Sequence, residues 1–426
     1  MTFDLLRRNA AFRWFWSARA VSLLGDGAAM VALLLLATDV GGPGAVALVL
    51  LAETVPRFFS PLAGALADRL ELRRLMLVCE LVQGVAFLAI VLLRPGLPVI
   101  VALVAASAAA STVIYAAGRP AVPRLVDEAD LPVANAWIGT AFNLQGALGA
   151  LIGGLLAAAV SPYGALGVNA ASAFVAVLLL LRTPRLPVQR AAADGAAATG
   201  YLADLRGGFR YVATNPTARL ICLLVFFGIL FGSLDNVALV LLATDVLDGG
   251  AAGFGILSGA FGMAMVAGSL WLTRPTSRFS PVVLLLGGWL STGVGLVLTG
   301  FAPWLAAAAL AQAVAGVGNA VANTSEYTVL QRAVPTELLG RVGGLLSLAS
   351  VSGSSLAYAI GAPLATAVSP RWVLFIAGGG LVVVVLIFVV PMLRATRGQD
   401  SPPAPNAPTE PTEDDPLPSG VAGGTA

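Results

Sequence analysis

The sequence predicts an all-α integral membrane protein, with twelve transmembrane helices in two pseudo-symmetric six-helix bundles and with cytoplasmic N- and C-termini. Three observations lead to this fold class. The 426 residues are 58% hydrophobic and 11% charged, whereas an average soluble domain has about 25% charged residues. The apolar residues gather into stretches long enough to cross a bilayer. The first half of the chain is repeated in the second half.

The predicted spans follow from length and composition, because a membrane-crossing helix needs about 20 mostly apolar residues. Gly- and Pro-rich segments such as residues 41–44 separate most of the stretches, and the shortest break is at residues 161–164. The twelve stretches are residues 14–38, 44–66, 75–94, 97–118, 133–158, 162–181, 218–244, 251–273, 281–301, 304–330, 342–368 and 371–394.

The orientation follows from the arginines, since the chain has no lysine or histidine and cytoplasmic loops are enriched in positive charge. The loops assigned to the opposite side carry Arg94 and Arg371. We therefore expect a multi-pass protein of the cytoplasmic (inner) membrane, surrounded by membrane lipids. The segments assigned to the cytoplasm carry Arg7, Arg8, Arg13, Arg69, Arg73, Arg74, Arg124, Arg182, Arg185, Arg190, Arg206, Arg210, Arg274, Arg278, Arg332, Arg341, Arg394 and Arg397.

An internal repeat divides the chain. Residues 34–40 recur with one change at residues 240–246, an offset of 206 residues, and the basic loops that follow the second and eighth spans keep this offset. Because an even number of helices separates the two copies, the halves are parallel repeats related by an axis along the membrane normal. Residues 1–182 and 218–394 are therefore expected to form the two bundles.

Two further segments have no spanning helix. Residues 183–217 form a linker that ends in an amphipathic stretch at residues 201–211, which we expect to lie on the cytoplasmic membrane surface. Residues 395–426 are rich in Pro, Gly and acidic residues and are expected to be a disordered cytoplasmic tail.

The residue types that are missing exclude several functions. Without His, and with Cys79 and Cys222 as the two cysteines, no familiar metal or haem ligand set and no Ser–His or Cys–His couple can be assembled. The net charge of +2 does not favour nucleic-acid binding. The cytoplasmic segments have no nucleotide-binding loop of the Walker type, so transport has to use an ion gradient or the gradient of the substrate. We expect no cofactor and no enzymatic activity.

Several motifs resemble those of the major facilitator superfamily. Residues 64–74 resemble its signature loop, with Glu71 and Leu72 near the place where the family usually has Gly. Residues 22–26, 134–136 and 334–341 resemble the drug and siderophore exporter branch, which includes macrolide efflux pumps and an enterobactin exporter. Residues 149–154 resemble the antiporter motif of the fifth helix, with Ala150 in place of its Pro. The resemblance covers the chain to about residue 394 and implies alternating access between two six-helix bundles.

The signature loop is interpreted as a conformational latch, and the glycines of the fifth helix as positions of close helix packing. Asp68 could accept hydrogen bonds from the exposed N–H groups at the start of a neighbouring helix, such as residues 342–344. The alternative is a plain basic turn for the loop and a static contact for the glycines. The latch residues are Gly64, Asp68, Arg69, Arg73 and Arg74, and the packing residues are Gly146, Gly149, Gly153 and Gly154.

Charged residues inside the membrane are the best functional candidates, because each costs a few kcal/mol or more unless it is shielded. Asp26 and Asp235 could carry a proton or bind a cationic substrate, and the alternative is a buried structural acid. Glu53 and Arg57 are four residues apart and are expected to form an intramembrane ion pair. We expect Arg19 and Glu80 to reach the aqueous boundary. The amides that could line a substrate cavity are Asn143, Gln145, Asn319 and Asn323.

Arg119 and Glu326 lie at nearly equivalent depths in the two halves, because 207 residues separate them. They could form a cytoplasmic gate that pairs when the mouth closes, or each could reach water within its own half. The function expected is proton-coupled export of a small amphipathic or cationic organic molecule, such as a drug, antibiotic or siderophore, by a monomer. The alternatives are an importer with the same fold and, from another class, an integral membrane lipid-modifying enzyme.

Overall fold

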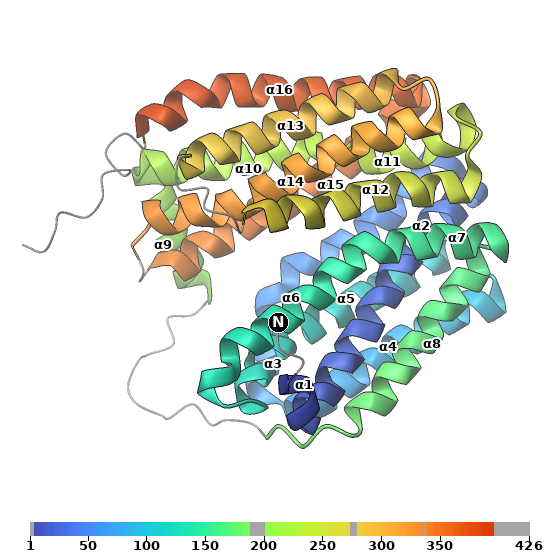
Figure 1. The fold of residues 1–426 in the computed structure, drawn as a ribbon, viewed down its shortest axis with the longest axis vertical. Helices are drawn as coiled ribbons and strands as arrows, with labels where there is room; N and C mark the ends of the chain where they lie inside the picture. The colour runs from blue at the N-terminus through green and yellow to red at the C-terminus, as the bar shows by residue number, and fades with distance from the viewer. Residues whose placement is uncertain (1–3, 188–200, 273–278, 336–337, 396–426) are drawn as a thin grey trace, which may run out of the picture.

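A computed structural model describes residues 4–187, 201–272, 279–335 and 338–395, and the regular elements in these ranges are all helical. Figure 1 shows two bundles side by side, one for each half of the sequence. The first bundle contains α1 (Asp4–Arg8), α2 (Ala10–Thr54), η1 (Val55–Phe59), α3 (Ser60–Arg69), α4 (Leu72–Leu93), α5 (Leu97–Ala121), η2 (Val122–Arg124), η3 (Glu128–Asp130), α6 (Leu131–Leu144), η4 (Gln145–Gly149), α7 (Ala150–Ala159) and α8 (Pro162–Leu180).

The second bundle follows the linker helix α9 (Tyr201–Thr214). It contains α10 (Pro216–Gly232), α11 (Asp235–Leu241), η5 (Leu242–Val246), α12 (Gly250–Leu272), α13 (Pro281–Phe301), α14 (Leu305–Ala333), α15 (Leu339–Ala367) and α16 (Pro370–Ala395). The rest of the predicted linker (residues 188–200), the loop with Arg274 and Arg278, and residues 396–426 of the predicted tail lie outside the described residues.

Several helices begin at a residue whose side chain caps them. The hydroxyl oxygen of Ser161 accepts a hydrogen bond from the backbone N–H of Gly164 (3.0 Å), and Pro162 is the first helical residue of α8. The side chain of Asn215 caps α10 in the same way before Pro216. A cap satisfies an N–H group that has no partner within the helix, and proline is tolerated there because it lacks an N–H. The expected break at residues 161–164 is confirmed.

Eleven helical segments of the described chain are long and apolar enough to cross a membrane. The first of them, Ala10–Arg69, has 60 residues, about 90 Å at 1.5 Å per residue and three times the thickness of the bilayer core. Gly42 interrupts it with a φ of +60°, and Pro43 follows. Because α1 and α3 lie at the same end of the bundle (Figure 1), the chain crosses the bundle and returns within this segment.

The two copies of the repeat share local geometry. Asp248, at the repeat position of Gly42, also has a positive φ of 50°. The Thr38 hydroxyl donates to the Leu34 carbonyl at 2.8 Å, and the equivalent Thr244 donates to the Val240 carbonyl at 2.9 Å. Similar turns therefore follow equivalent helices in the two halves.

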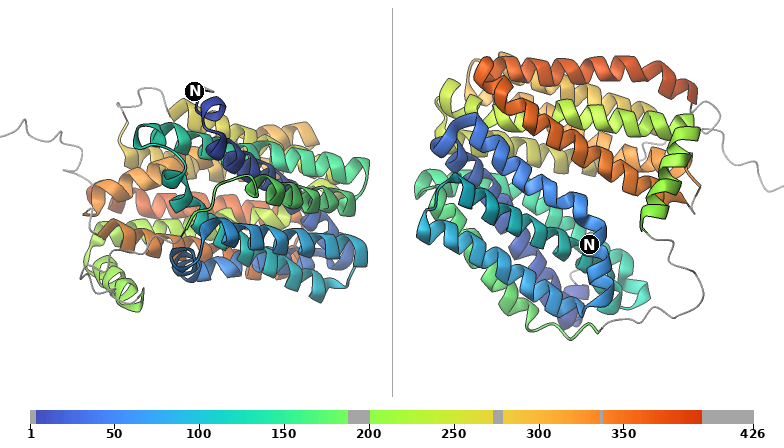
Figure 2. Two further views of the ribbon diagram at one scale, coloured as in Figure 1. Left: turned by 90° about the horizontal axis from the view of Figure 1, so that it is seen from below. Right: turned by 180° about the vertical axis from the view of Figure 1, so that it is seen from behind.

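The hydrophobic core shows where the halves meet. One buried cluster combines residues of both halves, including Leu36, Val46, Leu241 and Phe254. Two other clusters each belong to one half, and they lie toward the linker because one contains Leu186 and the other packs against Tyr211. The bundles therefore pack together at the end away from the linker and separate at the end that carries it (Figures 1 and 2).

The linker helix α9 packs against α10 and α15. A Cβ atom on Gly208 would lie 3.1 Å from the carbonyl oxygen of Arg341 at the start of α15, so the two helices approach closely. One face of the predicted amphipathic stretch is thus covered by the second bundle. Its position on the membrane surface stays a prediction.

Candidate functional site

A central cavity of about 920 Å³ lies between the two bundles. Helices α2, η1, α3, α4, α5, α6, η4 and α7 line it from the first half, and α11, α12 and α15 line it from the second. This volume is in the range of pockets that hold small organic ligands. The cavity is therefore large enough for the predicted class of substrate.

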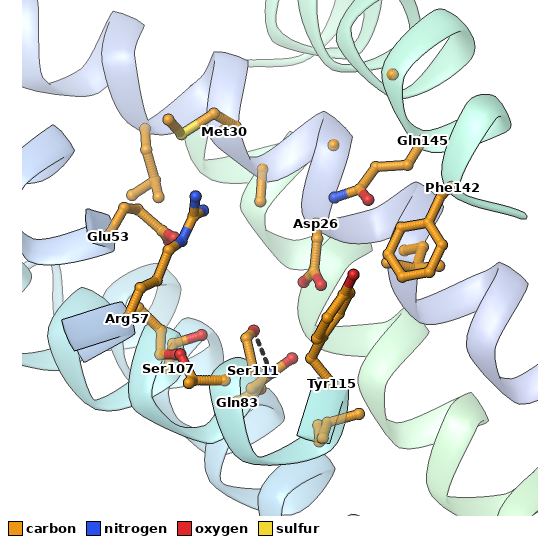
Figure 3. A pocket seen from close by; sticks show the side chains of 18 of the residues that line it. Asp26, Met30, Glu53, Arg57, Gln83, Ser107, Ser111, Tyr115, Phe142 and Gln145 are labelled. Atoms are coloured by element: carbon orange, nitrogen blue, oxygen red, sulfur yellow. Dashed lines mark hydrogen bonds between the residues drawn. The ribbon is translucent and has the colours of Figure 1, made fainter. Parts of the chain in front are cut away.

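The first half supplies most of the polar lining (Figure 3). Ser107, Ser111 and Tyr115 are spaced four residues apart on α5 and face the cavity from one side of that helix. Ser111 accepts a hydrogen bond of 2.6 Å from the amide of Gln83 on α4. Residues at this spacing share one face of a helix. This polar stripe on an apolar span is a signal in the sequence that the charged residues alone do not reveal.

Asp26 projects into the cavity beside Tyr115 (Figure 3). Within the described chain, its carboxylate has neither a hydrogen bond nor an ion pair with another side chain. Its neighbours fix the backbone: a Cβ atom on Gly25 would collide with Ser172 of α8, and one on Gly27 would lie 2.7 Å from the Gln145 carbonyl oxygen. Close packing at Gly25 and Gly27 therefore fixes the backbone of α2 on both sides of Asp26, whose carboxylate has no polar partner among the described residues.

Arg19 and Glu80 form a buried ion pair near Asp26. Their charged atoms are 3.5 Å apart, and the Ser22 hydroxyl donates to the other Glu80 oxygen at 3.1 Å. Glu80 has no exposed surface, and Arg19 is 8% exposed. The expectation that both would reach the aqueous boundary is wrong, because each neutralises the other inside the bundle. Arg19 also lines the cavity.

Glu53 and Arg57 both line the cavity, on the wall that faces Asp26 (Figure 3). No ion pair joins them in the described structure, although they are close enough for the Arg57 charge to act on Glu53. The Arg57 side chain is exposed to the cavity. The expected ion pair is therefore absent from the described structure, and it stays a prediction.

Of the other residues predicted to line the cavity, some lie in its wall and others do not. Gln145 lines the cavity, whereas Asp235, Asn319 and Asn323 are not among its lining residues. The Asn323 amide donates to Asn319 at 2.9 Å along α14. The side chain of Asn143 lies outside the described residues. Nothing in the described ranges brings three His, Cys, Asp or Glu side chains together as metal ligands would be.

The signature loop makes contacts within its own half. Arg73 donates to the Leu180 and Leu181 carbonyl oxygens at 3.0 and 2.7 Å, and so it caps the end of α8. Glu71, the departure from the family pattern, accepts hydrogen bonds from the backbone N–H groups of Arg74 and Leu186. This ties the loop to the start of the linker.

Arg74 forms an ion pair with Glu71 at 3.5 Å within the loop, whereas two other latch residues have no polar partner in the described structure. Asp68 and Arg69 are exposed, and neither has a hydrogen bond or ion pair in the part of the chain described. A Cβ atom on Gly64, Gly343 or Gly344 would meet open space. Because the halves are separated at this end, the latch remains a prediction for the state in which they close.

Arg119 and Glu326 are also apart. The Arg119 guanidinium donates to the Tyr115 hydroxyl at 3.3 Å, within the first half. Glu326 is 8% exposed and lies near Cys222 of α10, within the second half. The gate pairing likewise requires the closed mouth and stays a prediction.

Glycines allow close contact both within the first half and between the halves. A Cβ atom on Gly149 would lie 2.7 Å from the Cα atom of Gly27, and one on Gly153 would collide with Ala28. Across the halves, a Cβ atom on Gly255 of α12 would lie 2.7 Å from the Cα atom of Gly154. The carbonyl of Gly146 approaches Gly262, although a Cβ atom on Gly146 itself would meet nothing within 4 Å. Backbones can approach this closely because no side chain intervenes.

The chain is similar to known transport proteins. Residues 3–416 match the model of a family described as transmembrane secretion effector. The chain is 26% identical over 344 residues to the enterobactin exporter EntS of Escherichia coli O1:K1 / APEC, which covers 80% of this chain and 81% of that protein.

Solved structures share the fold. The nucleoside transporter NupG matches with a TM-score of 0.71 and 15% identity, over 89% of this chain and 98% of that chain. A bacterial homologue of the human lysosomal transporter Spinster, in an inward-facing and unoccupied conformation, matches with a TM-score of 0.62 and 14% identity, over 91% and 96% of the two chains. At these identities the likeness concerns the fold alone.

Proposed function

Because the chain belongs to the transmembrane secretion effector family of the major facilitator superfamily, and is thus a multi-pass membrane transporter for a small molecule, we propose that it is a proton-coupled exporter. Its substrate is a small amphipathic or cationic organic molecule, such as a drug, antibiotic, siderophore or related metabolite. The observation that carries the proposal is the available carboxylate of Asp26 in a large cavity between two bundles that lie apart at the linker end.

The cavity and the separation of the bundles support the following cycle. The arginine bias assigns the linker end to the cytoplasm, so the described conformation is open inward. Substrate that enters from the cytoplasm displaces a proton from Asp26, and the loaded cavity then opens outward. There a proton from outside binds Asp26 as the substrate leaves. One proton enters for each substrate exported, and the gradient drives the exchange. The transporter works as a monomer, because each chain contains both bundles.

The direction of transport is supported by the similarity to an exporter. The alternative is import with the same fold, which also serves a nucleoside transporter. Everted membrane vesicles with and without the protein would separate the two. We expect an imposed proton gradient to load these vesicles with a substrate found in a drug-susceptibility panel, and a proton ionophore to abolish the uptake. Gradient-driven uptake by whole cells instead of everted vesicles would support import.

The proposed topology has twelve spans, cytoplasmic termini and a cytoplasmic linker in the cell inner membrane. Reporter fusions test it directly. A fusion at Gln189, in the linker, should behave as cytoplasmic, and a fusion at Asp248, after η5, as external. An external reporter at Gln189 would contradict the orientation.

A further inference from the structure

A second, smaller cavity of about 220 Å³ lies within the first half, between α2, α5 and α6. We call it the side pocket. It shares Arg19, Ile114, Tyr115 and Phe142 with the central cavity. A molecule bound in the central cavity could therefore extend one substituent into the side pocket past these shared residues.

The charged residues that line the side pocket are two arginines, Arg19 and Arg119. Glu80 neutralises Arg19 at 3.5 Å, whereas Arg119 has no ion pair with an acid within the described ranges. The Arg119 guanidinium lies 5.1 Å from the centre of the Tyr115 ring and donates to the Tyr115 hydroxyl. Tyr115 thus holds in place an uncompensated positive charge. A planar guanidinium has several donors and favours an anionic group such as carboxylate.

The rest of the side pocket suits an aromatic ring. Tyr115 and Phe142 pack with their ring centres 5.5 Å apart at an angle of 66°, and Phe15 also lines the wall. Aromatic rings prefer such edge-to-face or offset contacts. The volume is below the range of pockets that enclose a whole drug-sized ligand, so it fits a single substituted ring.

Two glycines leave this space open. Gly118 on α5 and Gly139 on α6 both line the side pocket, and a Cβ atom on either would meet no other atom within 4 Å. A side chain at either position would therefore begin in open space beside the pocket lining. This gives a steric way to block it that leaves its charge unchanged.

We propose that the side pocket binds an aromatic ring that carries an anionic group, and that this ring is one end of the transported molecule. Arg119 pairs with the anion, the Tyr115 and Phe142 rings contact the aromatic face, and the remainder of the molecule occupies the central cavity. The role in transport rests on the proposed export function. The binding of the ring itself does not.

Equilibrium dialysis of radiolabelled benzoate against the purified full chain in lipid nanodiscs tests the proposal. We expect saturable binding, displaced by unlabelled benzoate but poorly by benzylamine or cyclohexanecarboxylate. Arg119→Gln should weaken binding about tenfold to a hundredfold, because a charge-assisted hydrogen bond is lost. Gly139→Leu should abolish it by filling the pocket.

Two control variants make the same substitutions, Arg to Gln and Gly to Leu, at positions outside the side pocket. Arg206→Gln removes an exposed arginine of α9, and Gly167→Leu enlarges a glycine of α8 that also has open space around it. Both should bind benzoate as the unmodified chain does. Gel filtration and thermal unfolding would verify that each variant is folded. Absence of saturable benzoate binding to the folded chain, or equal binding by Gly139→Leu, would overturn the proposal. Export is measured separately in everted vesicles. A failure of benzoate binding would therefore not contradict the proposed export function, and a failure of export would not contradict benzoate binding.

Discussion

The two halves share a fold but line the central cavity differently. Among the described lining residues, all of the charged side chains come from the first half: Arg19, Asp26, Glu53 and Arg57. The second half contributes Asn236, the hydroxyls of Ser258 and Ser347, and apolar or small residues. Its acids Asp235 and Glu326 are not among the lining residues. In the proposed cycle, the first bundle therefore recognises the substrate and couples its transport to protons, while the second bundle provides a neutral wall.

The repeat locates this difference at equivalent positions of the two halves. At the offset of 206 residues, Val225 and Leu286 of the second half correspond to Arg19 and Glu80. Both are buried in the hydrophobic cluster of that half. Gln83, which lines the cavity, corresponds to Trp289, which is buried against Gly228. The second half therefore fills with apolar side chains the space that the first half uses for polar groups.

The largest expected effect concerns the acids of the two halves. Asp26→Asn should abolish proton-driven efflux in reconstituted vesicles, because an amide cannot load and release a proton, while gradient-independent substrate exchange continues. Asp235→Asn is the matched change in the second half and should retain active efflux. If Asp26→Asn transports actively and Asp235→Asn does not, the coupling function belongs to the second half.

The buried ion pair should have the next largest effect. Glu80→Gln leaves the Arg19 charge buried without a partner, which should lower the free energy of unfolding by about 3–5 kcal/mol. The double variant Arg19→Val/Glu80→Leu copies the second half and should recover most of this stability, because apolar residues of similar volume can replace a buried pair. Thermal unfolding in detergent, followed by tryptophan fluorescence, measures both. A double variant as unstable as Glu80→Gln would show that the two halves do not tolerate the same packing.

A smaller effect is expected for the gate, which would join one residue from each half. Arg119→Glu and Glu326→Arg should each impair transport, by about 1–3 kcal/mol of coupling free energy, and the double exchange should restore much of it. The closed mouth would have to bring Glu326 out of its buried position beside Cys222. A double exchange no better than the worse single variant would mean that each charge serves its own half.

The fold could be predicted from the sequence because its signals are long and repeated. The apolar stretches, the glycine breaks between them and the 206-residue offset together involve many residues. The predicted fold therefore does not depend on the assignment of any single position. The presence of Asp26 and Gln145 in the cavity could also be predicted, since a polar group in an apolar helix needs a polar surrounding.

The pairing of side chains could not be predicted. Arg19 and Glu80 are 61 residues apart on helices whose rotation the sequence does not specify, so their contact becomes evident in the packed bundle. The same holds for Asn319 and Asn323, whose polarity resembles that of cavity residues although they bond to each other. The side pocket depends on space left by Gly118 and Gly139, and a glycine in the sequence does not reveal whether a neighbour fills that space.

The smallest expected effect concerns the neutral wall of the second half. Ser258→Ala and Ser347→Ala each remove one cavity hydroxyl, and a neutral hydrogen bond contributes about 0.5–1.5 kcal/mol. Each change should therefore weaken the apparent affinity for substrate by about two- to tenfold, with little change in the maximum rate, because the proposed proton site in the first half is untouched. Initial rates of everted-vesicle uptake over a range of substrate concentrations measure both quantities. Ser291→Ala, on α13 outside the cavity lining, is the matched control. Loss of proton-driven uptake in either cavity variant, at saturating substrate, would show that the second half takes part in coupling.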